Sequence, residues 1–409
     1  MYPLTDLGVL IQDEMDHTRL YSLDTIRHID VLDLLQVSSC GSENMTVQEV
    51  LEMDRRYYEF SGSYREMGRQ HGEAMREGAK RMCDIRLELS LKRARQVQPD
   101  YQMAQVLEVA AAHLPFHEQW CPDSYQELLG ISEGAGIAMK RLVVGNGYTD
   151  FVDVLVREAS GVCECTSIAA TGAATADGRL HLGQTWDMGF AAADYVVCIK
   201  RQPDEGPSTV GITTAGCLSL IGMNEAGICI GNTNVTPTDG RPGVIYLATM
   251  NEALRRTSFD EAVATVKQSP RASGHYFYLG GPEGQMVGLE TTATQVAEVA
   301  PDGLGLYAHT NHYQERTILQ WAARREGSAN SVDRQGRARQ LLEEGCGELG
   351  VAEMMEVLSD HAGDNPICRH TQDPASGASL AAVVMTPEER RISFTIGNAC
   401  ANPAVDMSP

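Results

Sequence analysis

The feature that most constrains the fold is a change of sequence pattern near residue 160. Between residue 57 and about residue 160, Met67, His71, Met75 and Met82 recur at four- and seven-residue intervals, a helical spacing. Beyond that point the chain turns to short alternating runs separated by glycine, asparagine or charged turn residues, which is typical of strands. A chain that groups helices with helices and strands with strands is predicted to form a layered α+β fold.

The later segments carry their own signals. The runs TSIAA and RLHLGQTWD flank Asp177-Gly178, a hairpin signal, and DYVVCIKR, GCLSLIGMN and GICIGNTNV predict further strands of an antiparallel sheet. A helix is predicted over about 244–256, and a second one after Ser258, which has capping-box spacing to Glu261. The runs GLETT and QVAEV predict strands, SVDRQGRARQLLEE and VAEMMEVLSDH predict amphipathic helices, and LAAVVM with RISFTI predicts a hairpin.

Composition excludes several function classes. The 409-residue chain has a formal net charge of −22, which disfavours nucleic acid or an anionic membrane as a partner. Its start shows no secretory signal, and no apolar run is long enough for a membrane helix. Eleven scattered cysteines fit reduced thiols better than a disulfide framework, so we expect a cytoplasmic protein. Residues 1–56 lack a firm period, and we expect an N-terminal extension that packs on the main body.

The segment GVCECTSIAATGAATADGRLHLGQTWDMG is the most informative for chemistry. Cys165 stands at a predicted strand start, and the pair Trp186-Asp187 closes the next strand. A nucleophilic thiol needs a nearby base, and a chain cut just before the cysteine supplies one as its new α-amine. An α-amine has a reference pKa of roughly 7.7 to 8.0, so it accepts a proton near neutral pH without any histidine.

These residues carry a family resemblance. E-C-T-S followed by D-G-R-L-H-L-G-Q-T-W-D resembles the autoprocessing segment of the penicillin acyltransferase family of N-terminal-nucleophile hydrolases. GSYREMGRQHG and LLGISEGAG resemble the helical precursor region of that family, and GCLSLIGMNEAGICIGNTN resembles its central strands. HTNHY and ICRH resemble two later signatures, so the resemblance covers roughly residues 57 to 400.

The resemblance implies a four-layer αββα sandwich of the N-terminal-nucleophile hydrolase type. It implies self-cleavage between Glu164 and Cys165, giving a mainly helical small chain over 57–164, preceded by the extension, and a large chain over 165–409. Both chains would form one domain and stay together as a heterodimer. The family usually has glycine before the nucleophile, whereas this chain has Glu164, whose side chain crowds the bond to be cut.

The resemblance also implies site residues. Cys165 is then nucleophile and base, and Asp187 is the carboxylate that orients it or assists self-cleavage. Asn311 donates its side-chain amide to the oxyanion, and Arg369 is the site arginine. We expect a thioester acyl-enzyme and hydrolysis of a small N-acyl amine or N-acyl amino acid, without a cofactor. The alternative is an acyltransferase that passes the acyl group to an amine.

The sequence is also compatible with other functions. Glu164 in place of glycine suggests an unprocessed relative that binds a small molecule or partner. Asp187 and Asn311 are residue types that are also common in turns, where they have a structural role. Arg369 could equally form an ion pair with Asp364 or Asp373. A zinc protein is a further alternative. It would use Cys163, Cys165, His309, His312, Cys368 and His370.

The sequence favours neither a cysteine–histidine dyad nor a nucleotide-binding site. His71 lies on the apolar stripe of its helix, which favours a core histidine over a cysteine–histidine dyad. The glycine runs match neither a P-loop nor a strand-linked dinucleotide fingerprint, so no nucleotide is expected.

Overall fold

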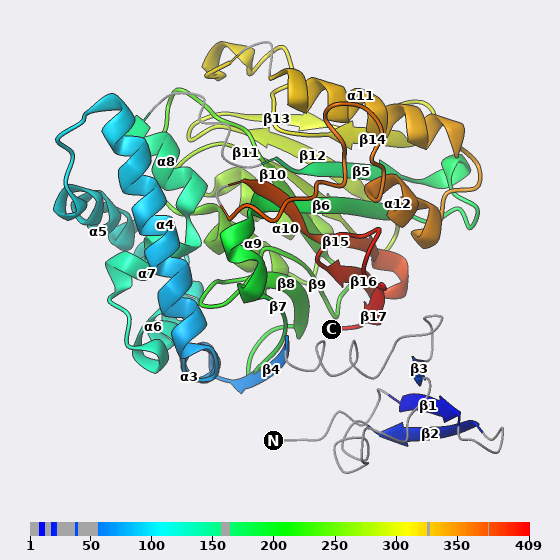
Figure 1. Cartoon of the computed structure of the whole chain (residues 1–409), viewed down its shortest axis with the longest axis horizontal. Coiled ribbons are helices and arrows are strands. Elements are labelled where there is room, and N and C mark those ends of the chain that lie inside the picture. The colour runs from blue at the N-terminus through cyan, green and yellow to red at the C-terminus, as the bar shows by residue number, and fades with distance from the viewer. Residues whose placement is uncertain are drawn as a thin grey trace.

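Two β-sheets packed face to face form the centre of the computed structural model (Figure 1). The structure describes residues 8–12, 18–22, 37–39, 56–156, 164–324, 328–374 and 376–409. The larger sheet has the strand order β13-β12-β11-β10-β9-β8-β7-β4, and the smaller sheet has the order β14-β5-β6-β15-β16-β17. Their inner faces share one hydrophobic core, which holds Leu182 and Ala381 from the smaller sheet and Ile230 and Phe277 from the larger one.

The strands of the larger sheet are β4 (Tyr57–Gly62), β7 (Val196–Pro203), β8 (Thr209–Thr214), β9 (Ile221–Asn224), β10 (Cys229–Asn234), β11 (His275–Gly280), β12 (Met286–Thr291) and β13 (Val296–Val299). Those of the smaller sheet are β5 (Thr166–Ala170), β6 (His181–Gly189), β14 (Leu306–His309), β15 (Gly377–Thr386), β16 (Arg391–Ile396) and β17 (Val405–Met407).

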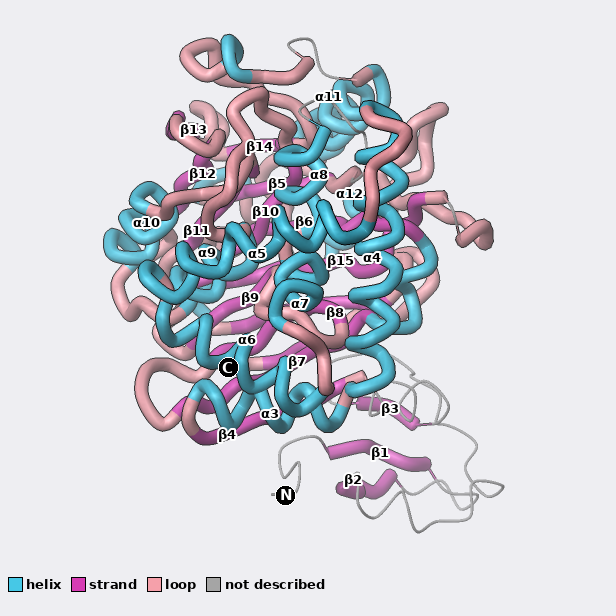
Figure 2. Tube along the Cα trace, turned by 90° about the vertical axis from the view of Figure 1, so that its left-hand side faces the viewer, coloured by secondary structure: helices cyan, strands magenta, loops and turns pink. Residues whose placement is uncertain are grey.

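Helices cover the outer face of each sheet. Their bounds are α3 (Tyr64–Ala74), α4 (Arg76–Val97), α5 (Met103–Trp120), α6 (Pro122–Ala135), α7 (Met139–Asn146), α8 (Tyr148–Val156), α9 (Tyr246–Leu254), α10 (Phe259–Gln268), α11 (Ala329–Glu344) and α12 (Val351–Leu358). Helices α11 and α12 pack on the smaller sheet, whereas α3, α9 and α10 pack on the larger one. Figure 2 shows α4 to α8 in front of the strands and α10 beside them. The predicted four-layer αββα sandwich is therefore confirmed.

The larger sheet departs from the prediction at one edge. Residues 57–62 were expected to belong to the helical region, but they form β4, and β4 pairs with β7 in parallel rather than antiparallel. The sequence YYEFSG is rich in aromatic residues, which favour strands, and only Phe60 among them is fully buried, as befits an edge strand. Helix α3 therefore begins only at Tyr64, and the hydroxyl of Ser63 accepts the backbone N–H of Glu66 as its N-cap.

Helices α3 and α6 approach each other closely because glycines line their contact. A Cβ atom on Gly68 would lie 2.1 Å from the carbonyl oxygen of Glu127, and one on Gly130 would lie 2.1 Å from that of Arg65. Gly134 faces α3 in the same way. The segments GRQHG and LLGISEGAG therefore combine into one helix pair that only glycine permits.

The N-terminal extension is described only in part. Its strands β1 (Gly8–Gln12), β2 (Thr18–Ser22) and β3 (Val37–Ser39) form a separate antiparallel sheet in the order β2-β1-β3. The expected packing of residues 1–56 on the main body lies outside the described residues and stays a prediction. Among the described helices, none combines the length and apolar composition needed to cross a membrane.

Candidate active site

Cys165 lies directly before β5, a strand flanked by β14 and β6 in the smaller sheet, and is only 3% exposed. Strand β6 pairs antiparallel with β5, with Thr166 opposite Thr185. The end of β6 therefore runs beside Cys165, and the Sγ atom lies 3.9 Å from the backbone oxygen of Asp187. The strand register thus brings together the two residues that the sequence motif joins.

Asn311 reaches Cys165 from the other side of β5. It follows β14, which pairs with β5 so that His309 lies opposite Ser167. The backbone N–H of Cys165 donates to Oδ1 of Asn311 at 2.8 Å. The Nδ2 of Asn311 donates to the backbone oxygen of Asn234 at 2.9 Å, at the end of β10 in the larger sheet. Asn311 therefore connects the two sheets at the position of the thiol residue.

Arg334 of α11 is a residue that the sequence analysis missed. Its side chain is fully buried, and its Nη1 donates to the backbone oxygen of Cys165 at 2.6 Å and to Oγ1 of Thr166 at 2.9 Å. Its Nη2 donates to Oδ1 of Asn311 at 2.9 Å. Hydrogen bonds from a charged donor are among the strongest in proteins. Asn311 and Arg334 together hold the backbone of Cys165 on both its nitrogen and its oxygen.

Asp187 is a buried carboxyl group in an unusual state. It is 1% exposed, and neither of its carboxylate oxygens has a hydrogen-bond partner in the described part of the chain. The hydroxyls of Ser379 and Thr185 lie nearby but outside hydrogen-bond geometry. Burial raises the pKa of Asp187 to about 7, against the opposing effects of the Arg334 charge and of these two hydroxyls. Asp187 can therefore exchange a proton at neutral pH.

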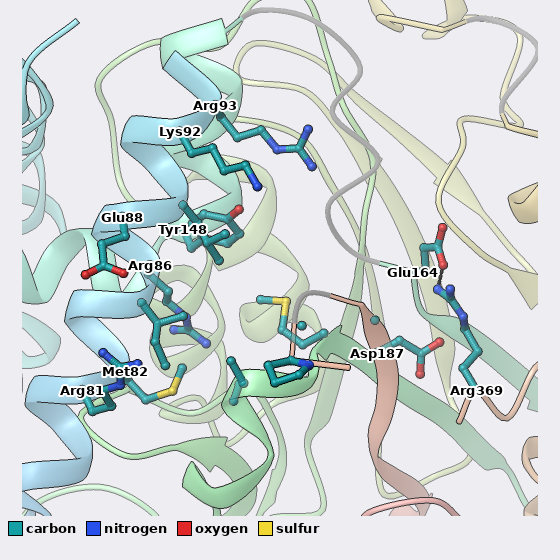
Figure 3. A pocket seen from close by; sticks show the side chains of 18 residues that line it. Arg81, Met82, Arg86, Glu88, Lys92, Arg93, Tyr148, Glu164, Asp187 and Arg369 are labelled. Atoms are coloured by element: carbon teal, nitrogen blue, oxygen red, sulfur yellow. Dashed lines mark ion pairs between the residues drawn. The ribbon is translucent and has the colours of Figure 1, made fainter. Parts of the chain in front are cut away.

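Glu164 and Arg369 form an ion pair next to the bond predicted to be cut. Figure 3 shows the pair at one end of a cavity, with Asp187 beside it. The backbone of Arg369 is fixed in turn: its N–H donates to Oγ of Ser379 at 3.0 Å, and its oxygen accepts from Nδ2 of Asn398 at 2.7 Å. Arg369 thus lies at the site but holds the residue before Cys165 rather than Cys165 itself.

A cavity of about 500 Å³ lies between α4 and the segment around Glu164 (Figure 3). Its lining includes five cationic and three acidic side chains. They are Arg81, Arg86, Lys92, Arg93 and Arg369, with Glu88, Glu164 and Asp187. The cavity is therefore a cationic region on a chain whose net charge is −22.

Not all of these cations are available to a ligand. Arg86 is buried and donates to the backbone oxygen of Gly145 and to Oγ1 of Thr214. Lys92 and Arg93 extend from α4 toward the cavity, and neither forms an ion pair within the described ranges, although Nη1 of Arg93 donates to Oε1 of Gln96 at 3.3 Å. These two side chains, like Arg81, can therefore meet an anionic group.

The residues proposed for other chemistries have other partners. The Nε2 of His71 accepts the N–H of Gly216 at 2.9 Å, and burial lowers the pKa of His71 to about 3, so it is a core histidine as predicted. Two of the residues considered as zinc ligands have other partners. Nε2 of His309 lies 2.9 Å from a carboxylate oxygen of Glu290, and Nδ1 of His312 lies 2.8 Å from Oγ of Ser331.

The rest of the zinc set is divided as well. Cys163 lies outside the described residues. Cys368 and His370 gather with His361 and Cys400 rather than with Cys165. The set considered from the sequence is therefore not assembled as one site.

A signal for Arg334 was present in the sequence. The buried residues of α11 are Ser331, Arg334, Ala338 and Leu342, which recur at helical intervals. An arginine on the apolar stripe of an amphipathic helix must find buried partners, and this position marks it as a site candidate. Asn234 carried no comparable signal, because its backbone rather than its side chain makes the contact with Asn311.

Comparison with known proteins identifies relatives of the chain. It is 26% identical over 350 residues to the acyl-coenzyme A:6-aminopenicillanic-acid-acyltransferase 40 kDa form of Emericella nidulans, covering 82% of this chain and 91% of that protein. It is also similar to two solved structures. A single-residue variant of conjugated bile acid hydrolase from Clostridium perfringens has 12% identity and a TM-score of 0.41, covering 60% of this chain and 97% of that one. Penicillin V acylase from Agrobacterium tumefaciens has 13% identity and a TM-score of 0.40, covering 60% and 86%.

The sequence profile of one family matches residues 174–400, which is more than half of the chain. This segment begins after Cys165 and contains Asp187, Asn311, Arg334 and Arg369. The chain belongs to the acyl-coenzyme A:6-aminopenicillanic acid acyl-transferase family.

Proposed function

We propose that this enzyme cleaves itself between Glu164 and Cys165 and then uses Cys165 as an N-terminal nucleophile on a small anionic amide. The observation that carries the proposal is that hydrogen bonds fix the backbone of Cys165 on both sides: its N–H donates to Asn311, and its oxygen accepts from Arg334. A structural cysteine needs no such fixation of its backbone. A nucleophile whose nitrogen becomes the catalytic base does need it.

Self-cleavage requires a base other than the amine, because the nitrogen of Cys165 is still an amide. Asp187 suits this step, since its pKa of about 7 lets it accept the thiol proton at neutral pH. The thiolate attacks the carbonyl carbon of Glu164, Asp187 gives the proton to the Cys165 nitrogen as the bond to that nitrogen breaks, and a thioester forms. Water then hydrolyses the thioester, leaving a carboxylate on Glu164 and a free α-amine on Cys165.

The mature reaction would repeat this chemistry on a substrate. The α-amine of Cys165 takes the thiol proton and returns it to the leaving amine, while Oδ1 of Asn311 accepts one amine hydrogen and so orients the nitrogen. One hydrogen of the Asn311 amide binds Asn234, and the other is available to the oxyanion of the tetrahedral intermediate. The acyl group then passes to water.

The two chains would remain together after cleavage. Strand β4 of the small chain pairs along its length with β7 of the large chain. The side chain of Asn146 donates to the backbone oxygen of Gly216 and accepts from the N–H of Leu218. These contacts support the heterodimer of 1–164 and 165–409.

The cavity supports an anionic substrate such as an N-acyl amino acid. Lys92 and Arg93 extend toward it and can meet a carboxylate. Arg369 already binds a carboxylate, that of Glu164, on the acyl side of the bond to be cut. The same guanidinium can serve a carboxylate of the substrate once the end of the small chain moves away.

A second activity, acyl transfer to an amine, is favoured by the family match and by the similarity to the Emericella nidulans acyltransferase. Which acceptor reacts depends on how well the bound acyl-enzyme excludes water. Both activities share the same thioester.

Mass spectrometry tests the proposal. The processed enzyme is mixed with a panel of N-acyl amino acids and neutral N-acyl amines and quenched in acid within the first turnovers. We expect the mass of one acyl group on the 165–409 chain, removed by hydroxylamine and absent from Cys165→Ala. An enzyme that turns over an amide while no acyl adduct forms on Cys165, or that keeps full activity as Cys165→Ala, would contradict it.

A further inference from the structure

A second cluster of reactive side chains includes the sequence neighbours of Arg369, and none of its four residues lines the cavity. The Sγ atoms of Cys368 and Cys400 and the imidazole nitrogens of His361 and His370 all lie within 4.8 Å of one another. Cys368 is buried, and the other three residues are exposed. Both cysteines are reduced thiols.

Four of the six distances within this cluster are close to those between ligands of one metal ion, and all four ligand atoms lie within 4.8 Å of one another. The two Sγ atoms are 3.7 Å apart, Nε2 of His370 lies 3.7 Å from Sγ of Cys368 and 3.2 Å from Sγ of Cys400, and the two Nε2 atoms are 2.9 Å apart. Zinc binds sulfur at about 2.3 Å and nitrogen at about 2.0 Å in a tetrahedron, so its ligands are about 3.8 Å apart for two sulfurs, about 3.5 Å for sulfur and nitrogen and about 3.3 Å for two nitrogens. Each observed distance lies close to these values.

We propose that His361, Cys368, His370 and Cys400 form a Cys2His2 zinc site. Two thiolates and two imidazoles are a donor set that selects zinc over magnesium or calcium, which prefer oxygen ligands. Four protein ligands close the coordination shell, so the ion is structural. Binding releases the two thiol protons, and the site carries no net charge.

The zinc site joins two segments that are distant in sequence. Three ligands lie in the connection between α12 and β15, and Cys400 follows β16. Asn398 links the same two segments, because its Nδ2 contacts Sγ of Cys368 at 3.5 Å and donates to the backbone oxygen of Arg369 at 2.7 Å. Such contacts around the ligands orient them and hold the metal.

A zinc ion at this site would position Arg369. Arg369 stands between the ligands Cys368 and His370, and its guanidinium pairs with Glu164 at the cavity. A bound zinc ion would fix the backbone on both sides of Arg369 and so restrict where its guanidinium can lie. This last step rests on the proposed function, whereas metal binding itself does not.

Metal analysis of the full chain, purified with a non-thiol reductant and without chelators, tests the site directly. We expect about one zinc per chain in the wild type and in Cys165→Ala, and the same in Cys346→Ser, which removes an exposed cysteine elsewhere. The variants His361→Asn and Cys400→Ser change exposed ligands and leave the core intact. They should lose most of the zinc, and Co²⁺ added to the apo wild type should give the visible absorption of tetrahedral thiolate coordination.

A second measurement follows the segment itself. Hydrogen exchange of the amides over 359–370 should accelerate when zinc is removed and return when zinc is restored, whether or not the enzyme is active. Three results would overturn the zinc site. The first is a wild type that is purified without metal and whose reduced apo form gives no Co²⁺ spectrum. The others are zinc retained in the double variant His361→Asn/Cys400→Ser, and a Cys368–Cys400 disulfide in place of the metal. Zinc binding in a chain that never cleaves itself would contradict the proposed function and leave the metal site intact.

Discussion

The raised pKa of Asp187 predicts a pH-dependent change in stability when its charge is removed. The comparison is made in Cys165→Ala, so that every protein remains one uncut chain. A carboxyl group whose pKa is raised by folding favours the folded state only in its protonated form. The unfolded chain loses its proton at about pH 4, so the fold is destabilised progressively above that pH until Asp187 itself ionises at about pH 7.

The magnitude follows from the shift. Between the ordinary aspartate pKa of 3.8 and about 7 the pKa rises by about 3, and each tenfold change in acidity is worth about 1.4 kcal/mol, so ionisation of Asp187 costs up to about 4 kcal/mol at pH 8. Asp187→Asn removes this cost. Relative to its parent, the Asn variant should gain about 2 kcal/mol in free energy of unfolding between pH 5.5 and pH 8.5.

Urea unfolding of both proteins at several pH values measures this difference. Asp204→Asn, which changes an exposed aspartate, is the matched control and should follow its parent at every pH. If the stability of the Asp187→Asn protein keeps a constant offset from its parent between pH 5.5 and 8.5, Asp187 does not have a raised pKa. In otherwise wild-type protein, the rate of self-cleavage should rise with pH to a plateau above about pH 7, and Asp187→Asn should slow it strongly.

Three further substitutions test other parts of the account. Arg334→Met removes charged hydrogen bonds worth about 1.5–3 kcal/mol each, so the rate of self-cleavage should fall at least 10-fold in a kinetic assay. A normal rate of self-cleavage would rule out a role for Arg334. Gly130→Ala places a methyl group against backbone atoms of α3 and should lower stability by at least about 1–3 kcal/mol in thermal melts, whereas Gly336→Ala, in open space on α11, should not. Lys92→Glu should raise the KM for N-acyl amino acids by about 10-fold but not that for neutral N-acyl amines, and equal effects on both would refute anion binding in the cavity.

Most of the fold could be predicted because the strand runs of residues 166–299 alternate and are bounded by turn residues. The helix after Ser258 also begins where its spacing indicated, with the hydroxyl of Ser258 accepting the N–H of Glu261. Strand β4 was missed because it is a short edge strand that joins the helical segment, and its partner β7 lies far away in the sequence. Parallel pairing of that kind leaves no local signal.

The site was predictable where one strand pair carries it and unpredictable where distant segments meet. Cys165 directly precedes β5 and Asp187 lies on β6, which pairs with β5, so the strand register places near each other two residues that the sequence motif joined through the family resemblance. The contact of Asn311 with Cys165 came from a motif, and its geometry depends on the pairing of β14 with β5. The partner of Arg369 could not be predicted, because Glu164 becomes its neighbour only through packing.

The cleavage claim is tested most directly by the intact mass and N-terminal sequence of the purified chain. The wild type should give two fragments whose masses sum to the 44.5 kDa chain plus one water, the larger beginning at Cys165, whereas Cys165→Ala should remain a single chain. A wild type that stays uncut, a fragment that begins at another residue, or cleavage at the same bond in Cys165→Ala would contradict the account.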